Sequence, residues 1–433
     1  MKTTELLGKK FECECGRVHE VPTRNLVYCE DAFERLDEIL GGFVEGRRVV
    51  VVADRRTQGI AGEHSQRALE AQGWSVDSII VPDTSHGDPV CDDLTFRWLE
   101  DRMPRCDIAL AAGSGVINDL TKWVAFERDV PYAVVATAAS MNGYASANVA
   151  PTVNGVKMLA SARAPMAVFA APSVIENAPF ELTAAGLGDV IAKPVSTADW
   201  IFNHIVNGEY FCRFCSEMLN SMEPLYFDHP QDIRAVEALF KALVYSGVAM
   251  TIIGTSAPAS GGEHLVSHTL DMMSSVDGTP HDLHGRQVGV GTLFASAMYE
   301  RILRIEECEC GDMPGEIDGA FWGGLADSVR EQYEQKKPAI AAMREKLSDG
   351  RRWREFLSAC RGHVRSPEQI KDCLKSAGAA HTLADIGCSR QRFVAAVMHM
   401  HEIRKRTTVV DLAWMLGVLP AAADEIIDRW LTS

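Results

Sequence analysis

With 433 residues the chain is too long for a single hydrophobic core, and at ~150 residues per domain we expect two or three domains. Its 47% hydrophobic and 24% charged residues are typical of a globular protein. The formal net charge of −16 argues against a nucleic-acid partner, because phosphate backbones bind to concentrated basic faces and the sequence has no long run of Lys or Arg. A small anionic substrate is compatible with this charge, since one local Arg or Lys can outweigh the average field.

No N-terminal stretch has the basic, apolar and small-residue parts of a signal peptide, and no segment reaches ~18 uninterrupted apolar residues. We therefore expect a cytoplasmic protein with no membrane contact. The 12 cysteines are too sparse for a disulfide scaffold in a chain of this length, and in a reducing compartment we expect them to be buried thiols.

Strand-like and helix-like segments alternate in the first part of the chain. The segment RRVVVVAD (47–54) contains a continuous β-branched run, as a buried parallel strand should. The same patterns predict strands at 75–83, 106–113 and 131–139 and helices at 65–74, 90–103 and 114–127. This alternation favours a doubly wound parallel sheet. We assign residues 1–180 to an α/β domain, with 1–30 as a candidate hairpin extension.

From residue 181 onward, amphipathic helical patterns replace this alternation. We expect residues 181–433 to form an all-helical domain. The predicted helices cover 181–193, 209–221, 231–253, 285–303, 317–347, 351–362, 366–377, 379–386, 389–403 and 408–431.

A glycine-punctuated turn follows the predicted third strand in AAGSGVINDLTK (111–122). Gly113 and Gly115 would let a ligand approach the backbone, and the amides that open the next helix suit a pyrophosphate. A structural turn is the competing interpretation, because the spacing is not G-x-G-x-x-G. Asp54 ends the first strand and could accept ribose hydroxyls, whereas Arg55 and Arg56 could meet a 2′-phosphate, so both NAD and NADP fit.

Four histidines lie in GGEHLVSHTLDMMSSVDGTPHDLHG (261–285). His264 and His268 are four residues apart and would share one face of a helix, and His284 precedes another helical pattern. Converging imidazoles could bind a divalent ion, although a satisfied core histidine is the competing interpretation. A carboxylate ligand would come from Asp189 in the apolar segment GLGDVIAK (186–193), which could instead be the N-cap of a helix that runs toward Trp200.

Six stretches occur in a recognisable order: GSGVINDLTK, ATAASMNGYAS, GLGDVIAKPVSTADW, ASGGEHLVSH, LHGRQVGVG and IRKRTTVVDLAWMLGVL. Together they resemble the sn-glycerol-1-phosphate dehydrogenase family, which is grouped with glycerol dehydrogenase, iron-containing alcohol dehydrogenase and dehydroquinate synthase. The resemblance covers nearly the whole chain from about residue 25. It implies a Rossmann-like nucleotide-binding domain followed by an all-helical domain that binds metal and substrate.

The resemblance also implies roles for particular residues. The family's metal ligands correspond to Asp189, His264 and His284, with zinc the usual ion and nickel or iron used by some relatives. His268 resembles a proton-relay or substrate residue, and Lys193 resembles a lysine that meets a substrate phosphate. Besides Asp54, which is a candidate from its place after the first strand, the residues that match NAD- or NADP-binding positions are Gly113, Ser114, Gly115, Asp119, Thr137, Ser140 and Ser146. Relatives are usually homo-oligomers.

The implied reaction is reduction of dihydroxyacetone phosphate to sn-glycerol 1-phosphate, or of a related ketose phosphate. Two departures from the family pattern weaken the substrate assignment: Asn142 in SMNG replaces an aspartate expected near the substrate hydroxyls, and Ala257 stands where many relatives have arginine. The alternatives are a glycerol-dehydrogenase-like enzyme for an unphosphorylated polyol, a dehydroquinate-synthase-like cyclase and a non-catalytic nucleotide-binding regulator.

The N-terminal sequence CECGRVH (13–19) raises a separate question. Cys13, Cys15 and His19 could bind a second metal with Cys29 as the fourth ligand, although the spacing falls short of paired C-x2-C knuckles. The competing interpretation is a β-hairpin with CGRVH as its turn.

Overall fold

The computed structural model describes residues 5–84, 87–234 and 236–432, which form two compact units. The first unit contains the chain up to Gly186 together with Asp232–Thr255, and the second contains Leu187–Gln231 and the chain from Ser256 onward. This division differs from the sequence-based boundary at residue 180, chiefly because the segment 232–255 belongs to the first unit. The described helices include none with the length and apolar character needed to span a bilayer.

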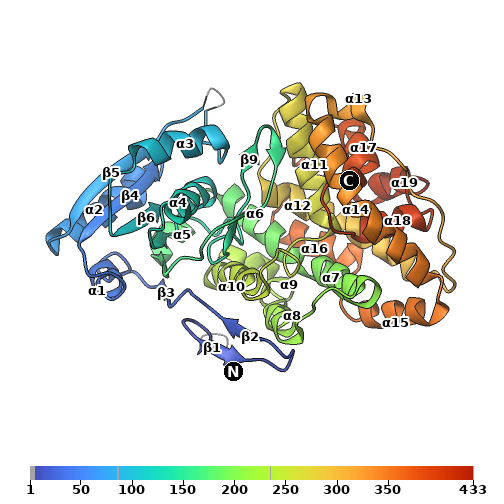
Figure 1. Cartoon of the computed structure of the whole chain (residues 1–433), viewed down its shortest axis with the longest axis horizontal. Helices are drawn as coiled ribbons and strands as arrows, with labels where there is room; N and C mark the ends of the chain where they lie inside the picture. Colours follow the sequence, from blue (N-terminus) through green and yellow to red (C-terminus); the bar gives the residue numbers. More distant parts are fainter. Residues whose placement is uncertain (1–4, 85–86, 235, 433) are drawn as a thin grey trace. The chain divides into compact units, whose positions relative to one another are not determined.

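A six-stranded parallel sheet forms the centre of the first unit, and the predicted α/β class is confirmed (Figure 1). The strand order is β3-β12-β7-β6-β4-β5, with every neighbouring pair parallel. The strands are β3 (Asn25–Tyr28), β4 (Arg48–Asp54), β5 (Ser75–Val81), β6 (Ile108–Ala112), β7 (Tyr132–Val135) and β12 (Ala167–Ala170). Because all six strands run in one direction, their carboxyl ends lie at one edge of the sheet, where ligands bind in such folds.

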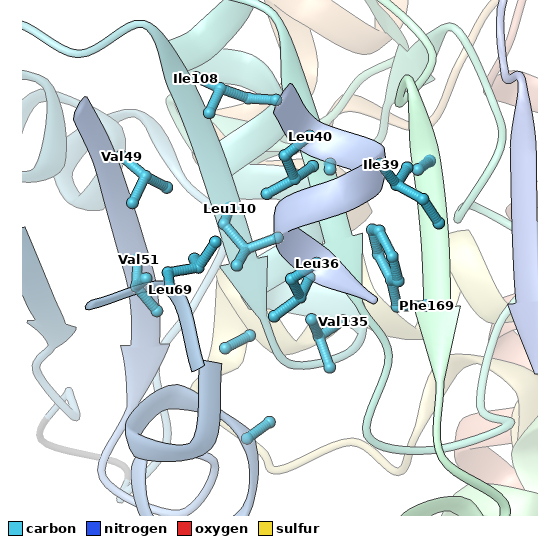
Figure 2. Close-up of a cluster of buried hydrophobic side chains, with 14 of the residues drawn as sticks. Leu36, Ile39, Leu40, Val49, Val51, Leu69, Ile108, Leu110, Val135 and Phe169 are labelled. Carbon is cyan, nitrogen blue, oxygen red and sulfur yellow. The ribbon is translucent and has the colours of Figure 1, made fainter. Parts of the chain in front are cut away.

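One face of the sheet packs against α1 (Leu36–Gly41) and α2 (Glu63–Ala71). Side chains alternate between the two faces of a strand, so Val49 and Val51 point into this cluster while Val50 and Val52 are buried on the other side. Figure 2 shows side chains of α1, of α2 and of the strands meeting in one continuous core. Helices α3 (Asp93–Arg102) and α4 (Gly115–Glu127) also pack against the sheet, outside this cluster.

The first unit also contains small antiparallel strand pairs. Two further helices in it are α10 (Glu237–Ile253) and the short α5 (Pro172–Glu176). An N-terminal hairpin is formed by β1 (Lys10–Glu12) and β2 (Val18–Glu20). The other pairs are β8 (Asn148–Val149) with β11 (Ala160–Ser161) and β9 (Thr152–Val153) with β10 (Val156–Lys157). A Cβ at Gly247 of α10 would approach the carbonyl oxygen of Asn142 to 2.8 Å, so glycine lets α10 pack closely on the loop that follows β7.

The second unit is helical, as predicted. Helix α6 begins in the first unit, and the division falls within it. The principal helices are α6 (Phe180–Ile191), α7 (Lys193–Asn207), α8 (Arg213–Asn220), α11 (Gly262–Asp277), α12 (His284–Ile302), α14 (Ala326–Leu347), α15 (Gly350–Arg361), α16 (Pro367–Ser376), α17 (Arg390–His399), α18 (Val409–Met415) and α19 (Ala423–Trp430).

Several predicted helix boundaries are wrong. Helices α7 and α11 fill gaps between the predicted helices. The segment 379–386 forms turns instead of a helix, because the Asp385 carboxylate accepts hydrogen bonds from two successive backbone amides. The predicted helix 408–431 is two helices, since Gly417 adopts a left-handed conformation after α18 and Pro420 cannot donate a helical hydrogen bond.

A buried lysine holds the loop that follows β7 against α4. The Lys122 ammonium donates to the carbonyl oxygens of Gly143 and Asn148 at 2.6 and 3.1 Å and lies 3.1 Å from the Ser146 hydroxyl. It is completely buried, and burial lowers its pKa. These contacts fix the backbone over 143–148 at the carboxyl edge of the sheet.

We predict that Lys122→Met destabilises the protein by about 2 to 4 kcal/mol, because the loop carbonyls and the nearby Asp119 lose their buried partner. Urea unfolding should show the loss. Lys241→Met is the matched control, since Lys241 lies on the surface in a pair with Glu237 one turn away. Equal stability of the two variants would refute this role for Lys122.

Candidate metal and nucleotide sites

Three side chains of the helical unit converge on one point. Asp189 lies in α6, His264 lies in the first turn of α11, and His284 begins α12. One ligand atom from each of the three lies within 4.8 Å of the others, so the group could hold a divalent ion. The alternative role of Asp189 as an N-cap is wrong, because it lies inside α6 and Ala192 precedes the first residue of α7.

Glycines allow the helices that carry two of these residues to approach each other. A Cβ at Gly188 would overlap the carbonyl oxygen of Gly285, so the backbones of α6 and α12 touch at this point. Asp189 and His284 are the residues next to these glycines. The close approach of α6 and α12 therefore brings the Asp189 carboxylate and the His284 imidazole near each other.

Each histidine of the group has a hydrogen-bond partner for Nδ1. His264 Nδ1 lies 2.8 Å from Glu263 Oε1, and His284 Nδ1 lies 2.8 Å from the Ser267 hydroxyl. The His284 Nε2 atom faces Asp189 at 4.0 Å from Oδ1. Partners of this kind orient an imidazole and leave Nε2 to coordinate metal. The donor set thus fits a divalent ion that accepts nitrogen and oxygen ligands.

Burial and positive charge dominate the electrostatics of this group. Burial lowers the pKa of His264 well below its usual value, and Lys193, Arg404 and Arg406 lower it further. Burial also raises the pKa of Glu263 and lowers that of Lys193. A neutral His264 is the form that binds metal, and the surrounding cations favour a bound anion.

His268 lies beside the candidate metal ligands. Its ring stacks on that of His284, with 5.4 Å between centroids and 14° between planes, and its Nδ1 accepts a hydrogen bond from Arg404 Nε at 3.3 Å. Arg404 has a positive φ of 64°, an uncommon conformation for a residue with a side chain and one that is often found at functional sites. His281 lies outside the group, with its Nδ1 3.1 Å from Asp271 Oδ1.

The residues expected to meet substrate lie in different parts of the chain. Lys193 is buried at the start of α7, and its ammonium donates to the carbonyl oxygen of Ala259 at 3.1 Å. Ala257 is buried in the turn before α11. Asn142 is half-buried in the loop after β7, in the first unit. Of these residues, Lys193 and Ala257 belong to the helical unit that also contains the candidate metal ligands.

The glycine-rich turn joins β6 to α4 in the first unit, as predicted. Gly113 directly follows the strand and packs tightly, since a Cβ there would come within 2.8 Å of Ile117. Gly115 has a φ of +20° and open space where a Cβ would lie, and Ser114 precedes it without a side-chain cap. These features could admit a phosphate at the helix N-terminus. Asp119 lies one turn further on, where it accepts from the amide of Ala150 at 3.3 Å.

Asp54 forms the turn at the end of β4. Its carboxylate accepts hydrogen bonds from the amides of Arg56 and Thr57 at 2.7 and 2.8 Å. Arg55 and Arg56 both pair with Asp83, which follows β5. A 2′-phosphate bound by these arginines would therefore compete with the Asp83 carboxylate.

The remaining cofactor candidates lie after β7. Thr137 and Ser140 are nearly buried on the segment that leaves the strand. The Ser146 hydroxyl lies 3.1 Å from the Lys122 ammonium. It also lies within hydrogen-bond distance of the carbonyl oxygens of Gly143 and Asn148. Its contacts indicate that it shapes the loop.

The sequence interpretation missed several residues that surround the candidate sites. Glu263, Ser267 and Arg404 all lie inside motifs that were recognised. Ser267 and Arg404 contact histidines 17 and 136 residues away, whereas Glu263 contacts its neighbours Gly261 and His264. Asp199 is fully buried in α7 and accepts from Tyr299, Val409 and Gly262. Acids within apolar helical segments, such as Glu263 and Asp199, are the signal that could have found two of them.

Comparisons with known proteins agree with this architecture. A family model described as iron-containing alcohol dehydrogenase matches residues 27–179. A glycerol-1-phosphate dehydrogenase, NAD(P)+, from Geobacillus stearothermophilus is 30% identical over 407 residues, which cover 92% of this chain and 94% of the relative. A protein of the same name from Pyrococcus furiosus is 34% identical over 261 residues, covering 58% of this chain and 71% of the relative.

Among solved structures, a probable glycerol dehydrogenase from Sinorhizobium meliloti 1021 has a TM-score of 0.61 at 16% identity, covering 94% of this chain and 96% of its own. Glycerol dehydrogenase from Schizosaccharomyces pombe has a TM-score of 0.58 at 14% identity, with coverage of 94% and 91%. These likenesses show a shared fold. Because the Geobacillus relative is 30% identical and matches most of both chains, the chain belongs to the glycerol-1-phosphate dehydrogenase family.

Proposed function

We propose that the protein reduces dihydroxyacetone phosphate to sn-glycerol 1-phosphate with NADH or NADPH and one divalent ion. The observation that carries this proposal is the presence of Lys193, Arg404 and Arg406 around the Asp189–His264–His284 group, because all three cations act on the electrostatics of His264. A metal site for a neutral polyol has no need of such charge, whereas a phosphorylated ketose brings an anion that cations stabilise.

The metal would be held by Asp189, His264 and His284, with zinc our first choice and nickel or iron the alternatives. When bound, the ion supplies Lewis-acid polarisation of the ketone. Glu263 and Ser267 fix the two imidazoles so that their Nε2 atoms are available as ligands. The donor set of one carboxylate and two imidazoles leaves room for a substrate oxygen.

Lys193 would bind the substrate phosphate. Its ammonium donates to the carbonyl oxygen of Ala259, and because an ammonium has three donors it can also donate to an anion. Burial lowers its pKa, and a bound phosphate would favour its charged form. Asn142 would contact the substrate hydroxyls as a neutral donor and acceptor in place of the family aspartate.

His268 would deliver the proton that the substrate oxygen takes up on reduction. Arg404 donates to its Nδ1, and its ring lies flat on His284, so its position is fixed relative to the candidate metal ligands. Histidine is the side chain that most often transfers a proton to or from a reacting group in enzymes.

The nucleotide would bind at the carboxyl edge of the parallel sheet. Its pyrophosphate would lie on the turn of Gly113, Ser114 and Gly115, with Asp119 close by on α4. Asp54 would accept from the ribose, and Thr137 and Ser140 would line the nicotinamide side, with Ser146 supporting their loop. The reduced nicotinamide supplies the hydride.

The proposal predicts a preference for the phosphorylated ketose. Purified protein with zinc or nickel should oxidise NADH or NADPH with dihydroxyacetone phosphate, and the KM should rise about 10- to 100-fold for Lys193→Met because a charge-assisted hydrogen bond is lost. The same change should leave KM for dihydroxyacetone unaltered. Arg301→Met is the control, since Arg301 pairs with Glu425 on the surface. Faster turnover of dihydroxyacetone would favour the unphosphorylated-polyol alternative, with which Asn142 and Ala257 agree.

Ser267→Ala should weaken metal binding about 10- to 100-fold, because His284 loses the partner that orients its ring. Metal affinity can be measured by titration of the metal-free protein with zinc or nickel. Ser275→Ala is the matched control on the same helix, since its exposed hydroxyl donates to the carbonyl oxygen of Asp271. An unchanged affinity in Ser267→Ala would contradict the assignment of His284 as a ligand.

Gly188→Ala should separate α6 from α12 and weaken metal binding more strongly than Gly289→Ala. A Cβ at Gly188 overlaps the Gly285 carbonyl, whereas a Cβ at Gly289 finds its nearest neighbour at an ordinary 3.5 Å. Metal titration and circular dichroism of both variants check this difference. If Gly188→Ala folds and binds metal like the parent protein, the helix contact does not set the ligand geometry.

A further inference from the structure

The N-terminal hairpin brings a second group of metal-binding side chains together. Strands β1 and β2 pair with Phe11 opposite His19. The turn between them is closed by hydrogen bonds from the Cys13 amide to Arg17 and from the Gly16 amide to Cys13, at 3.0 and 2.9 Å. Gly16 has a φ of 83°, which residues with a side chain rarely adopt. The hairpin interpretation is correct, although the turn is Cys13–Arg17 and His19 lies in β2.

The ligand atoms of this hairpin point at one another. One atom each from Cys13, Cys15 and His19 lies within 4.8 Å of the others, and Cys15 Sγ is 3.3 Å from His19 Nε2. Ligand atoms in a tetrahedral zinc site, with bonds of ~2.3 Å to sulfur and ~2.0 Å to nitrogen, lie about 3.6 Å apart. The Cys15–His19 separation of 3.3 Å is close to that spacing, and the other separations are at most 4.8 Å.

His19 is held in place within the hairpin. It is only 3% exposed, and the ring of Phe11 packs edge-on against it with 5.6 Å between centroids. A polar ring buried in this way keeps its Nε2 directed toward the cysteines of the turn. Burial and packing against Phe11 thus order the His19 ring through contacts of the protein itself, which lowers the cost of ordering the ligands.

We propose that Cys13, Cys15 and His19 bind a thiophilic divalent ion of the zinc class, separate from the ion of the helical unit. The two thiolates are soft donors and the imidazole is a borderline donor, whereas Asp189, His264 and His284 offer no sulfur. The fourth position of the ion is filled by water or by a further side chain. Cys29 is not part of the group, because its thiol interacts with Asp31 and Arg35.

The ion has a structural purpose in the hairpin. Each strand contains three residues, and β1 and β2 form a two-stranded sheet of their own. A two-stranded hairpin is at best marginally stable in water, so its own hydrogen bonds contribute little to its order. An ion that joins the turn to β2 adds its binding free energy to the folded form of the hairpin.

Cobalt(II) provides a test that distinguishes a site with thiolate ligands from the Asp189–His264–His284 group. The metal-free, reduced full-length protein is titrated with cobalt, and near-ultraviolet absorption from thiolate-to-cobalt charge transfer is recorded. We expect this absorption in the parent protein and in His264→Ala, because the helical group contributes no thiolate. It should be lost in Cys13→Ser and Cys15→Ser and retained in Cys29→Ser. Absence of the band from the parent protein, or its retention in both Cys13→Ser and Cys15→Ser, would overturn the proposal.

Zinc content gives a second measurement that does not depend on activity. In a His264→Ala background, which removes a ligand of the helical group, Cys13→Ser should lower bound zinc by about one equivalent per chain. His19→Ala should do the same, and circular dichroism should show that the helices remain. An unchanged zinc content in folded Cys13→Ser and His19→Ala proteins would refute the site.

Discussion

Charge buried inside an apolar helical unit is the constraint on which the candidate metal site depends. Asp189, Asp199 and Glu263 are at most 1% exposed, and an ionised carboxylate in such a place requires hydrogen bonds or opposite charge. Glu263 Oε1 accepts from the Gly261 amide and lies beside His264 Nδ1, so compensation of one acid also orients a candidate ligand. The same hydrogen bonds thus stabilise a buried carboxylate and orient a candidate metal ligand.

Asp199 shows how this requirement shapes the surrounding helices. Its two oxygens accept from the Tyr299 hydroxyl and from the amides of Val409 and Gly262. Three segments that are distant in sequence therefore meet at one carboxylate in α7. One of them is the first residue of α11, which positions His264 two residues later. Asp199 is therefore not an isolated acid in the core, because its carboxylate joins α7 by hydrogen bonds to the helices that carry the site.

The parallel sheet imposes a different kind of constraint on the first unit. All six strands end at one edge, so the turns after β4, β6 and β7 lie at that edge without any special interaction. Buried Lys122 then holds the loop after β7 in one conformation. The strand order brings these turns to one edge of the sheet, and the buried Lys122 ammonium fixes the conformation of the loop after β7.

The sequence by itself determined the parallel strands and the identity of the chemical groups. A run such as VVVV at residues 49–52 suits a strand buried on both faces, and motif order identified Asp189, His264 and His284 as candidate ligands. Only the tertiary structure decided what joins them: the contact of Gly188 with Gly285, the bonds from Glu263 and Ser267 to the imidazoles, and the cations near His264. Apart from the adjacent Glu263–His264 pair, these depend on distances between residues that are separated in the chain, which local periodicity and propensity do not encode.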